Sequence, residues 1–300
     1  MNIGFVGLGS MGTPMARNLV AAGFAVTGYD LNPKALKTLE NNGGRSAASI
    51  VDAARDADAL VLMVVNAAQA EGLLFDGGAL DALPKDASVL LMATCPPGAV
   101  KSLAERVQAA GRSFVDCPVS GGTKGAEAAN LTIMAAADLA TLGRVRPVLE
   151  AMGDKVFHVG TKPGQGAAVK TVNQLLCGVH LAVAAEGLSL AVKIGVDPDI
   201  LLKILGGSAA ASWMLNDRGL RMIEADPPVS SAVDIFVKDL GIVLEAGREC
   251  KAALPLAAIA HQLFLAASGR GDGAKDDSQV IRSYAALNGA SGGGQAGVPA

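Results

Sequence analysis

Three polar side chains stand close together in an otherwise apolar stretch of the 300-residue chain. Lys170, Asn173 and Gln174 follow Gly164-Gln165-Gly166, and their spacing of three and four residues puts them on one face of a helix. Burying an ammonium group is unfavourable unless it is paired or neutralised, and a lysine acts as a base near neutral pH only when its pKa is lowered. Lys170 is therefore a candidate general acid or base, and the amides could orient a reacting oxygen. The alternative is a lysine on the solvent face of an amphipathic helix.

A glycine-rich turn connects the first predicted strand, residues 2–6, to the first predicted helix, and a second strand at 25–29 follows. In a Gly-x-Gly-x-x-Gly turn the first glycine permits the tight bend, the second lets the backbone approach a pyrophosphate, and the third lets helix and strand pack closely. The start of the helix offers free N–H groups to phosphate. The pattern predicts dinucleotide binding rather than a plain glycine-rich turn. The predicted contacts are Gly7, Leu8, Gly9, Ser10, Met11 and Gly12.

An acid, Asp30, ends the second strand, eighteen residues after Gly12. Its carboxylate can accept the ribose hydroxyls and would repel a 2′-phosphate. The next residues, Leu31-Asn32, include no arginine that could hold such a phosphate. The sequence therefore predicts NAD, rather than NADP, as the cofactor.

Two further strands end at polar residues. Residues 59–65 form an apolar stretch that ends at Asn66, and residues 88–93 form another that ends at Thr94. In open α/β sheets, ligands lie outside the carboxyl ends of the strands, so both side chains are candidates for contacting the cofactor. The alternative for each is that it caps the following helix.

A small polar loop follows the predicted strand at 113–116. Its Ser120-Gly121-Gly122 sequence offers backbone N–H groups and a hydroxyl, which together could form a nest for a carboxylate. Taken alone, the same residues could form an ordinary tight turn.

The pattern of elements predicts two domains. Strands and helices alternate as far as about residue 160, and after Pro163 only helices are expected. They are predicted at 165–194, 212–222, 233–250, 255–268 and 278–287, with a further one that Asp197-Pro198 caps and starts. We therefore expect an α/β protein with a Rossmann-type dinucleotide-binding domain at 1–162 and an all-helical domain at 163–288. The glycine- and alanine-rich tail, 289–300, is expected to be disordered.

Composition excludes several classes of function. The net charge is −3, and neither a basic stripe for nucleic acid nor a Lys/Arg-rich amphipathic helix for a membrane surface is apparent. The four cysteines and three histidines are too scattered for a zinc site or a disulfide framework, which predicts reduced thiols, a cytoplasmic location and no metal. His180 and Glu186 interrupt the apolar stretch at 175–192, which favours a core helix over a membrane span.

Four motifs in a fixed order resemble the β-hydroxyacid dehydrogenase family, the group of 3-hydroxyisobutyrate dehydrogenase, tartronate semialdehyde reductase and 6-phosphogluconate dehydrogenase. They are the glycine turn at 7–12, Asp116-Cys117-Pro118-Val119-Ser120-Gly121-Gly122, Gly164-Gln165-Gly166 with Lys170, and Lys238-Asp239-Leu240-Gly241. The resemblance covers about residues 1–288. Within the family, segments such as 64–69, 174–180, 212–214 and 275–278 look most like the L-threonate dehydrogenases.

The resemblance implies a role for each motif. Lys170 would be the catalytic lysine, which exchanges a proton with the reacting oxygen. Ser120, Gly121 and Gly122 would hold the substrate carboxylate. Val65, Asn66 and Thr94 would contact the cofactor, and Lys238 would lie near its nicotinamide end. Without the resemblance, Lys238-Asp239 would be interpreted as a solvated ion pair.

One position departs from the common family pattern. Many members carry asparagine four residues after the lysine, where this chain has Gln174, preceded by Asn173. Threonate-type members resemble this chain in having glutamine there. Either amide could therefore supply the second catalytic side chain. Lys238 and the charge that develops on the nicotinamide could both lower the pKa of the catalytic lysine.

Two hypotheses from different classes follow. The first is NAD-dependent oxidation of a small hydroxy acid such as L-threonate, with 3-hydroxyisobutyrate and tartronate semialdehyde as alternative substrates. The second is an NAD-binding sensor without dehydrogenase activity, but such a protein needs neither Lys170 nor the Ser120 loop. The partners expected are a small hydroxy acid and further copies of the chain in a homodimer or homotetramer, with no nucleic acid and no membrane.

Overall fold

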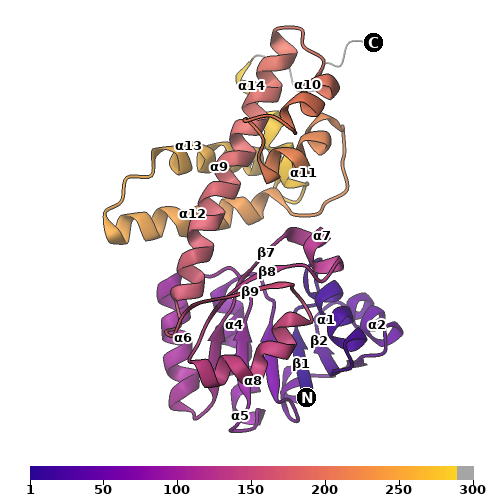
Figure 1. Cartoon of the computed structure of the whole chain (residues 1–300), viewed down its shortest axis with the longest axis vertical. Helices are drawn as coiled ribbons and strands as arrows, with labels where there is room; N and C mark the ends of the chain where they lie inside the picture. The colour runs from indigo at the N-terminus through magenta and orange to yellow at the C-terminus, as the bar shows by residue number, and fades with distance from the viewer. Residues whose placement is uncertain (289–300) are drawn as a thin grey trace. The chain divides into compact units, whose positions relative to one another are not determined.

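The computed structural model describes residues 1–288. The chain divides into two compact units, Met1–Lys170 and Thr171–Ala300. The first contains a mostly parallel sheet flanked by helices and the second is helical, so the predicted fold class is confirmed (Figure 1). The tail predicted to be disordered, 289–300, lies outside the described residues.

The first unit is built on one nine-stranded sheet with the order β3-β2-β1-β4-β5-β6-β8-β7, and β9 pairs with β8. The six strands from β3 to β6 along this order are parallel, whereas β8 is antiparallel to both β6 and β7. The strands are β1 (Asn2–Val6), β2 (Ala25–Tyr29), β3 (Arg45–Ser46), β4 (Ala59–Leu62), β5 (Ser88–Leu91), β6 (Ser113–Asp116), β7 (Val119–Ser120), β8 (Thr132–Ala136) and β9 (Lys155–Gly160).

Helices cover both faces of this sheet. They are α1 (Gly12–Ala21), α2 (Pro33–Asn41), α3 (Ile50–Ala54), α4 (Ala67–Glu71) continued by the π-helical turn η1 (Gly72–Asp76), α5 (Ala79–Ala82), α6 (Pro97–Ala109), α7 (Gly122–Glu127) and α8 (Leu139–Glu150). Val61 and Leu90 pack in the same core as α1, α2 and α8, whereas Leu60 and Leu62 pack in a second core with α3 to α6. Because side chains alternate across a strand, two buried faces explain why these strands are continuously apolar.

The predicted strands are confirmed, but the central ones are shorter than their apolar runs. β4 ends at Leu62 and β5 at Leu91, although the apolar residues continue to Val65 and Ala93. Met63 and Met92 still donate backbone hydrogen bonds to Val6 O and Leu62 O, and the chain leaves the sheet after them, at its carboxyl edge. The short elements β3, β7, α3, α4, α5 and α7 were not predicted, because segments of two to six residues carry too little periodicity.

The second unit is formed by helices. Most of α9 (Gln165–Lys193) lies here, followed by α10 (Pro198–Leu205), α11 (Trp213–Ile223), α12 (Val233–Cys250), α13 (Pro255–Ala267) with the π-helical turn η2 (Ser268–Asp272), the 3₁₀ turn η3 (Asp277–Val280) and α14 (Ile281–Leu287). The helix predicted at 278–287 therefore begins as a 3₁₀ turn. Asp276 accepts a hydrogen bond from the backbone N–H of Ser278, which favours this tighter start.

Helix α9 is the one described helix that is long and apolar enough to cross a membrane by length and composition, with a mean hydropathy of 1.8 over its most apolar window. One side of it is part of a protein core. Leu181, Ala185 and Leu188 are buried with residues of α11, α12 and α13. This packing is what the sequence predicted for a core helix.

Candidate active site

The predicted cofactor residues of the first unit follow four neighbouring strands, β2, β1, β4 and β5, at one edge of the sheet. Val6 at the end of β1 is paired with Tyr29 of β2 on one side and with Leu62 of β4 on the other. The backbone N–H of Gly7 donates to Tyr29 O at 3.1 Å. The strand order reverses between β1 and β4, and such a reversal opens a crevice for ligands in doubly wound sheets.

Each glycine of the turn has its own geometric reason. Gly7 has a φ of +90°, which disfavours other residues. A Cβ on Gly12 would overlap the carbonyl oxygen of Gly7, so the third glycine permits the helix α1 to start against the turn. A Cβ on Gly9 would meet nothing within 4 Å. The second glycine is therefore not needed for packing, and it leaves the backbone uncovered where a pyrophosphate would approach. The residues of this turn fit a dinucleotide.

Asp30 is fixed against this turn. Its Oδ2 accepts a hydrogen bond of 2.6 Å from the backbone N–H of Leu8, and its Oδ1 accepts one of 2.7 Å from the N–H of Asn32. The carboxylate is partly exposed. Each oxygen keeps a second lone pair, so the group can still accept from a ribose hydroxyl.

The polar residues after β4 and β5 have different local roles. Asn66 Oδ1 accepts from the backbone N–H of Gln69 and so caps α4, which was the alternative given by the sequence. Val65 is half exposed, and its N–H donates to the Gln69 side chain. Thr94 follows β5, next to β4 in the sheet, and the residue that occupies the cap position of α6 is Pro96.

Asp116, at the end of β6, holds the start of α9. Its Oδ2 accepts hydrogen bonds from the backbone N–H groups of Gly164 at 2.8 Å and Ala167 at 3.0 Å. A Cβ on Gly166 would lie 2.7 Å from the backbone oxygen of Asp116, so this glycine permits the close approach. Burial raises the pKa of Asp116 to about 6, against the lowering effect of these N–H donors. Sequence reasoning did not assign this role, although an acid at the end of a buried strand was the available signal.

The Ser120 loop is held on the same part of the sheet. Ser120 ends β7 and is paired with Thr132 of β8, while Met134 of β8 packs against Gly166 at the start of α9. Gly121 and Gly122 have φ values of +127° and +62°, a backbone that non-glycine residues rarely adopt. Strand β8 thus positions both the predicted carboxylate nest and the helix that carries Lys170.

Lys170 lies on the buried side of α9. The residue is only 6% exposed, which contradicts the alternative of a lysine on a solvent face. Gln174, one turn later, is also buried, whereas Asn173 is half buried and its Nδ2 donates to the sulfur of Cys177 at 2.9 Å. Gln174 therefore shares the buried face of Lys170, and Asn173 points along the helix to a different partner.

Lys238 and Asp239 belong to the second unit, on α12. Lys238 Nζ lies 2.7 Å from Asp239 Oδ1, and the Asp239 side chain is 2% exposed. The interpretation as a solvated ion pair is therefore wrong for the acid. Asp239 also accepts a hydrogen bond from Gln174 Nε2.

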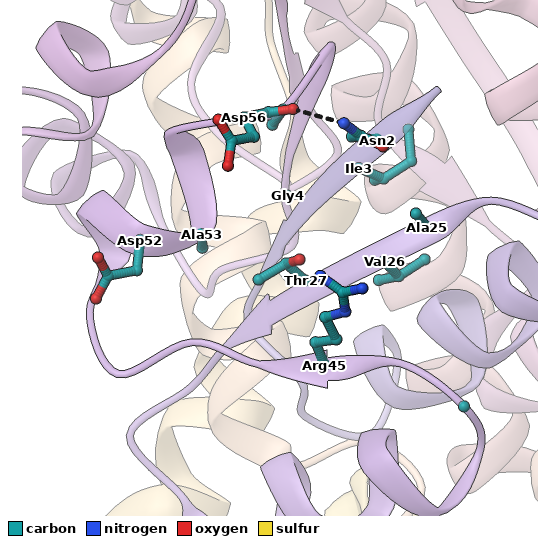
Figure 2. Close-up of a pocket in the computed structure, with 12 residues that line it drawn as sticks. Asn2, Ile3, Gly4, Ala25, Val26, Thr27, Arg45, Asp52, Ala53 and Asp56 are labelled. Atoms are coloured by element: carbon teal, nitrogen blue, oxygen red, sulfur yellow. Dashed lines mark hydrogen bonds between the residues drawn. The ribbon is translucent and has the colours of Figure 1, made fainter.

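A separate pocket of about 310 Å³ lies at the opposite ends of the strands (Figure 2). It is lined by the first residues of β1 and β2 and by Arg45 and Asp52, and Asn2 Nδ2 donates to the backbone oxygen of Asp56 at 3.1 Å. None of the predicted site residues lines it. Within residues 1–288, the structure has no group of three or more His, Cys, Asp or Glu side chains that could hold a metal ion.

Comparison with known proteins covers nearly the whole chain. Residues 2–160 match the model of the NAD-binding domain of 6-phosphogluconate dehydrogenase, and residues 164–284 match the model described as NAD-binding of NADP-dependent 3-hydroxyisobutyrate dehydrogenase. An L-threonate dehydrogenase of Cupriavidus necator is 42% identical over 94% of this chain and 96% of its own. A 3-hydroxyisobutyrate dehydrogenase of Pseudomonas aeruginosa is 35% identical over 88% of this chain and 91% of its own.

The structural comparison agrees with the sequence comparison. A crystal structure described as 3-hydroxyisobutyrate dehydrogenase from Salmonella typhimurium has a TM-score of 0.90 and 39% sequence identity, and it covers 94% of this chain and 99% of its own. Family models and full-length relatives thus agree with the motifs and the fold. The chain belongs to the β-hydroxyacid dehydrogenase family and is an oxidoreductase that acts on the CH–OH group of a hydroxy acid with NAD or NADP.

Proposed function

We propose that this enzyme oxidises a four-carbon sugar acid, L-threonate or a close analogue, with NAD as the hydride acceptor and Lys170 as the general base. The burial of Lys170 carries the mechanism, because a nearly dry lysine is the kind whose ammonium form is destabilised. The substrate class is supported by the similarity to L-threonate dehydrogenases, one of which is 42% identical.

The chemistry divides between the cofactor and the chain. NAD, when bound, accepts the hydride from the alcohol carbon. Lys170 Nζ takes the proton of the same hydroxyl group, so that the carbon becomes a carbonyl carbon and the lysine becomes an ammonium. In the reverse direction the ammonium returns the proton to the carbonyl oxygen.

The Ser120 loop is the proposed site for the substrate carboxylate. Gly121 and Gly122 carry no side chains that would cover the backbone N–H groups of this loop, and the hydroxyl of Ser120 adds a further donor. Because β8 holds both this loop and the start of α9, the same strand would set the distance between the carboxylate and the reacting hydroxyl. That arrangement favours a small acid.

The proposal is tested by NADH formation with purified enzyme on L-threonate, D-threonate, D-erythronate, 3-hydroxyisobutyrate, glycerate and L-serine, each with NAD and with NADP. The expected result is the highest kcat/KM for L-threonate with NAD. A clear preference for 3-hydroxyisobutyrate, or reduction of tartronate semialdehyde as the faster reaction, would replace the substrate and keep the class. No turnover together with measurable NADH binding would favour a non-catalytic binding role.

We further propose that the protein is a cytoplasmic homo-oligomer. Leu176, Val183 and Leu190 of α9 are spaced by seven residues and are 48%, 57% and 59% exposed. Exposed apolar residues at heptad spacing form a continuous stripe, which a second copy of the same helix can cover. A dimer built in this way would have each copy cover the stripe of the other.

A further inference from the structure

The Asp239 carboxylate connects two residues of the proposed reaction. One of its oxygens, Oδ2, accepts a hydrogen bond of 2.5 Å from Gln174 Nε2, and the other, Oδ1, lies 2.7 Å from Lys238 Nζ. Gln174 and Asp239 are both buried. Burying a carboxylate is costly unless it is paired, so Asp239 depends on the ion pair with Lys238 and on the hydrogen bond from Gln174, while Oδ1 has no hydrogen-bond donor among the described residues.

Close packing of two helices brings Asp239 to Gln174. Gly178 lies one turn after Gln174 on α9, and Leu240 follows Asp239 on α12. A Cβ on Gly178 would lie 2.8 Å from a methyl group of the buried Leu240, so a larger residue would require this side chain to shift. Glycine at 178 therefore lets α9 and α12 pack closely near the level where Gln174 reaches Asp239.

The hydrogen bond fixes which end of the amide faces the acid. If the amide were reversed, Gln174 Oε1 would face Asp239 Oδ2, and two acceptors would meet in a buried site. The Nε2 end is therefore held at Asp239. With Nε2 at Asp239, the acceptor Oε1 is at the other end of the amide, on a side chain that shares its helix face with Lys170.

We propose that Asp239 is a positioning residue, which orients the Gln174 amide so that its Oε1 accepts a hydrogen bond from a substrate hydroxyl. The inference rests on the proposed function and narrows it. The substrate group opposite Gln174 must be a donor, which a hydroxyl of a polyhydroxy acid is and an ionised carboxylate is not. The carboxylate of the substrate is thereby assigned to another part of the site.

The same geometry explains glutamine at position 174. Asparagine is shorter by one methylene, about 1.5 Å of reach. In this chain Gln174→Asn would draw the amide away from Asp239 and leave a buried carboxylate oxygen without its donor. We therefore expect Gln174→Asn to behave like loss of the amide rather than as a conservative change.

The test is a double-mutant cycle of Asp239→Ala and Gln174→Met, with Asp239→Asn as the conservative variant and Glu245→Gln as the control. Glu245 is an exposed acid on the same helix, α12. The measurements are kcat and KM on the hydroxy acid that the substrate panel selects, the Kd of NADH from its fluorescence, and the melting temperature of each variant.

We expect each single variant to lose about 10- to 100-fold in kcat/KM. Gln174→Met removes the amide that would bind the substrate hydroxyl, and Asp239→Ala leaves this amide unoriented. The double variant should be no slower than the slower single variant, since Asp239 acts through Gln174. Asp239→Asn, whose Oδ1 can still accept from Nε2, should recover most of the loss. NADH binding and the Glu245→Gln variant should be unchanged.

Two results would overturn the inference. Fully multiplicative losses in the double variant would show that Asp239 and Gln174 act independently. An equal loss in Asp239→Asn and Asp239→Ala would show that the charge beside Lys238, and not the acceptor, is what matters. If the wild-type enzyme turns over no acid in the panel, the proposed function fails, and the positioning role of Asp239 fails with it. Non-additive changes of the melting temperature in the cycle would then show only that Asp239 and Gln174 are in contact.

Discussion

Asp30 Oδ2 accepts a hydrogen bond of 2.6 Å from the backbone N–H of Leu8, so the acid that follows β2 is tied to the glycine turn that follows β1. The carboxylate therefore has two roles that the sequence alone did not separate. It holds the turn in place, and it presents negative charge beside the position expected for the adenosine ribose. A substitution there changes both the charge and the turn.

Asp30→Ala and Asp30→Asn should separate these two roles. Removal of the negative charge should raise the NADP-to-NAD ratio of kcat/KM by about 10-fold in both variants, because a like charge no longer faces the 2′-phosphate. Asp30→Asn keeps one acceptor for a backbone N–H, so it should retain tighter binding of NAD than Asp30→Ala does. Kinetics with both cofactors measure the ratio. A ratio that stays at the wild-type value in both variants would contradict the assignment of cofactor preference to Asp30.

Lys170→Ala should leave a folded protein that binds NADH but loses about 10³-fold in kcat, since general acid–base catalysis contributes on this scale. Lys193→Ala is the matched control, because Lys193 is an exposed lysine at the other end of the same helix. The comparison uses steady-state kinetics and NADH fluorescence. Activity near the wild-type value in Lys170→Ala would remove the lysine from the mechanism.

Lys238 is a weaker candidate for an electrostatic effect on Lys170, the proposed general base, than the sequence indicated. Its ammonium lies 2.7 Å from the carboxylate of Asp239, so the positive charge of the pair is largely offset.

The buried acid Asp116 makes the stability of the protein depend on pH. Its pKa is raised by burial from 3.8 to about 6, so between these values the folded state binds more protons than the unfolded state does. The contribution of Asp116 to stability is therefore greatest below about pH 4 and falls as the pH rises through about 6. The total change is on the order of 3 kcal/mol.

Asp116→Asn isolates this effect, because asparagine can still accept from the N–H groups at the start of α9 but does not titrate. The free energy of unfolding of the wild type minus that of Asp116→Asn should decrease from pH 4 to pH 6 and stay constant above pH 7. Urea unfolding at a series of pH values measures it. A difference that does not vary with pH would mean that Asp116 is not the titrating group.

The sequence predicted the first unit well because its signals are local. Alternating apolar strands, the glycine spacing and Asp30 all lie within short segments, and each was found where expected at the carboxyl edge of the sheet. Asn66 could not be decided in this way, because a cap and a cofactor contact require the same residue type after a strand.

The contacts of Asp116 and Asp239 could not be predicted, since they join residues far apart in the chain. Asp116 reaches Gly164 across 48 positions, and Gln174 reaches Asp239 across 65. A sequence shows an acid in a motif but does not show which buried donor it meets. For the same reason, the sequence around Lys238-Asp239 does not distinguish a surface ion pair from one whose acid is buried, as Asp239 is.

Gly178→Ala should destabilise the second unit by about 1–3 kcal/mol, because the added methyl group would lie 2.8 Å from Leu240 and force the two helices apart. The same change should lower kcat/KM, since it separates Gln174 from Asp239. Gly143→Ala is the control, as a Cβ on this helical glycine of α8 would meet nothing within 4 Å. That variant should be about 0.5–1 kcal/mol more stable than the wild type. Thermal unfolding of the wild type, Gly178→Ala and Gly143→Ala tests both expectations. Equal melting temperatures for the three proteins would contradict the packing of Gly178 against Leu240.

Charge placed in the apolar stripe of α9 should dissociate the proposed oligomer. Leu176→Lys and Val183→Lys each put an ammonium group on an exposed part of α9, where a monomer can solvate it but a helix-to-helix interface cannot. Light scattering coupled to size-exclusion chromatography should therefore report a smaller assembly for these variants than for the wild type. Leu139→Lys is the control, because Leu139 is a 71%-exposed apolar residue of α8 outside the stripe. The mass of the assembly formed by this variant should equal that of the wild type. An unchanged mass in all three variants would mean that the stripe is not the contact between copies.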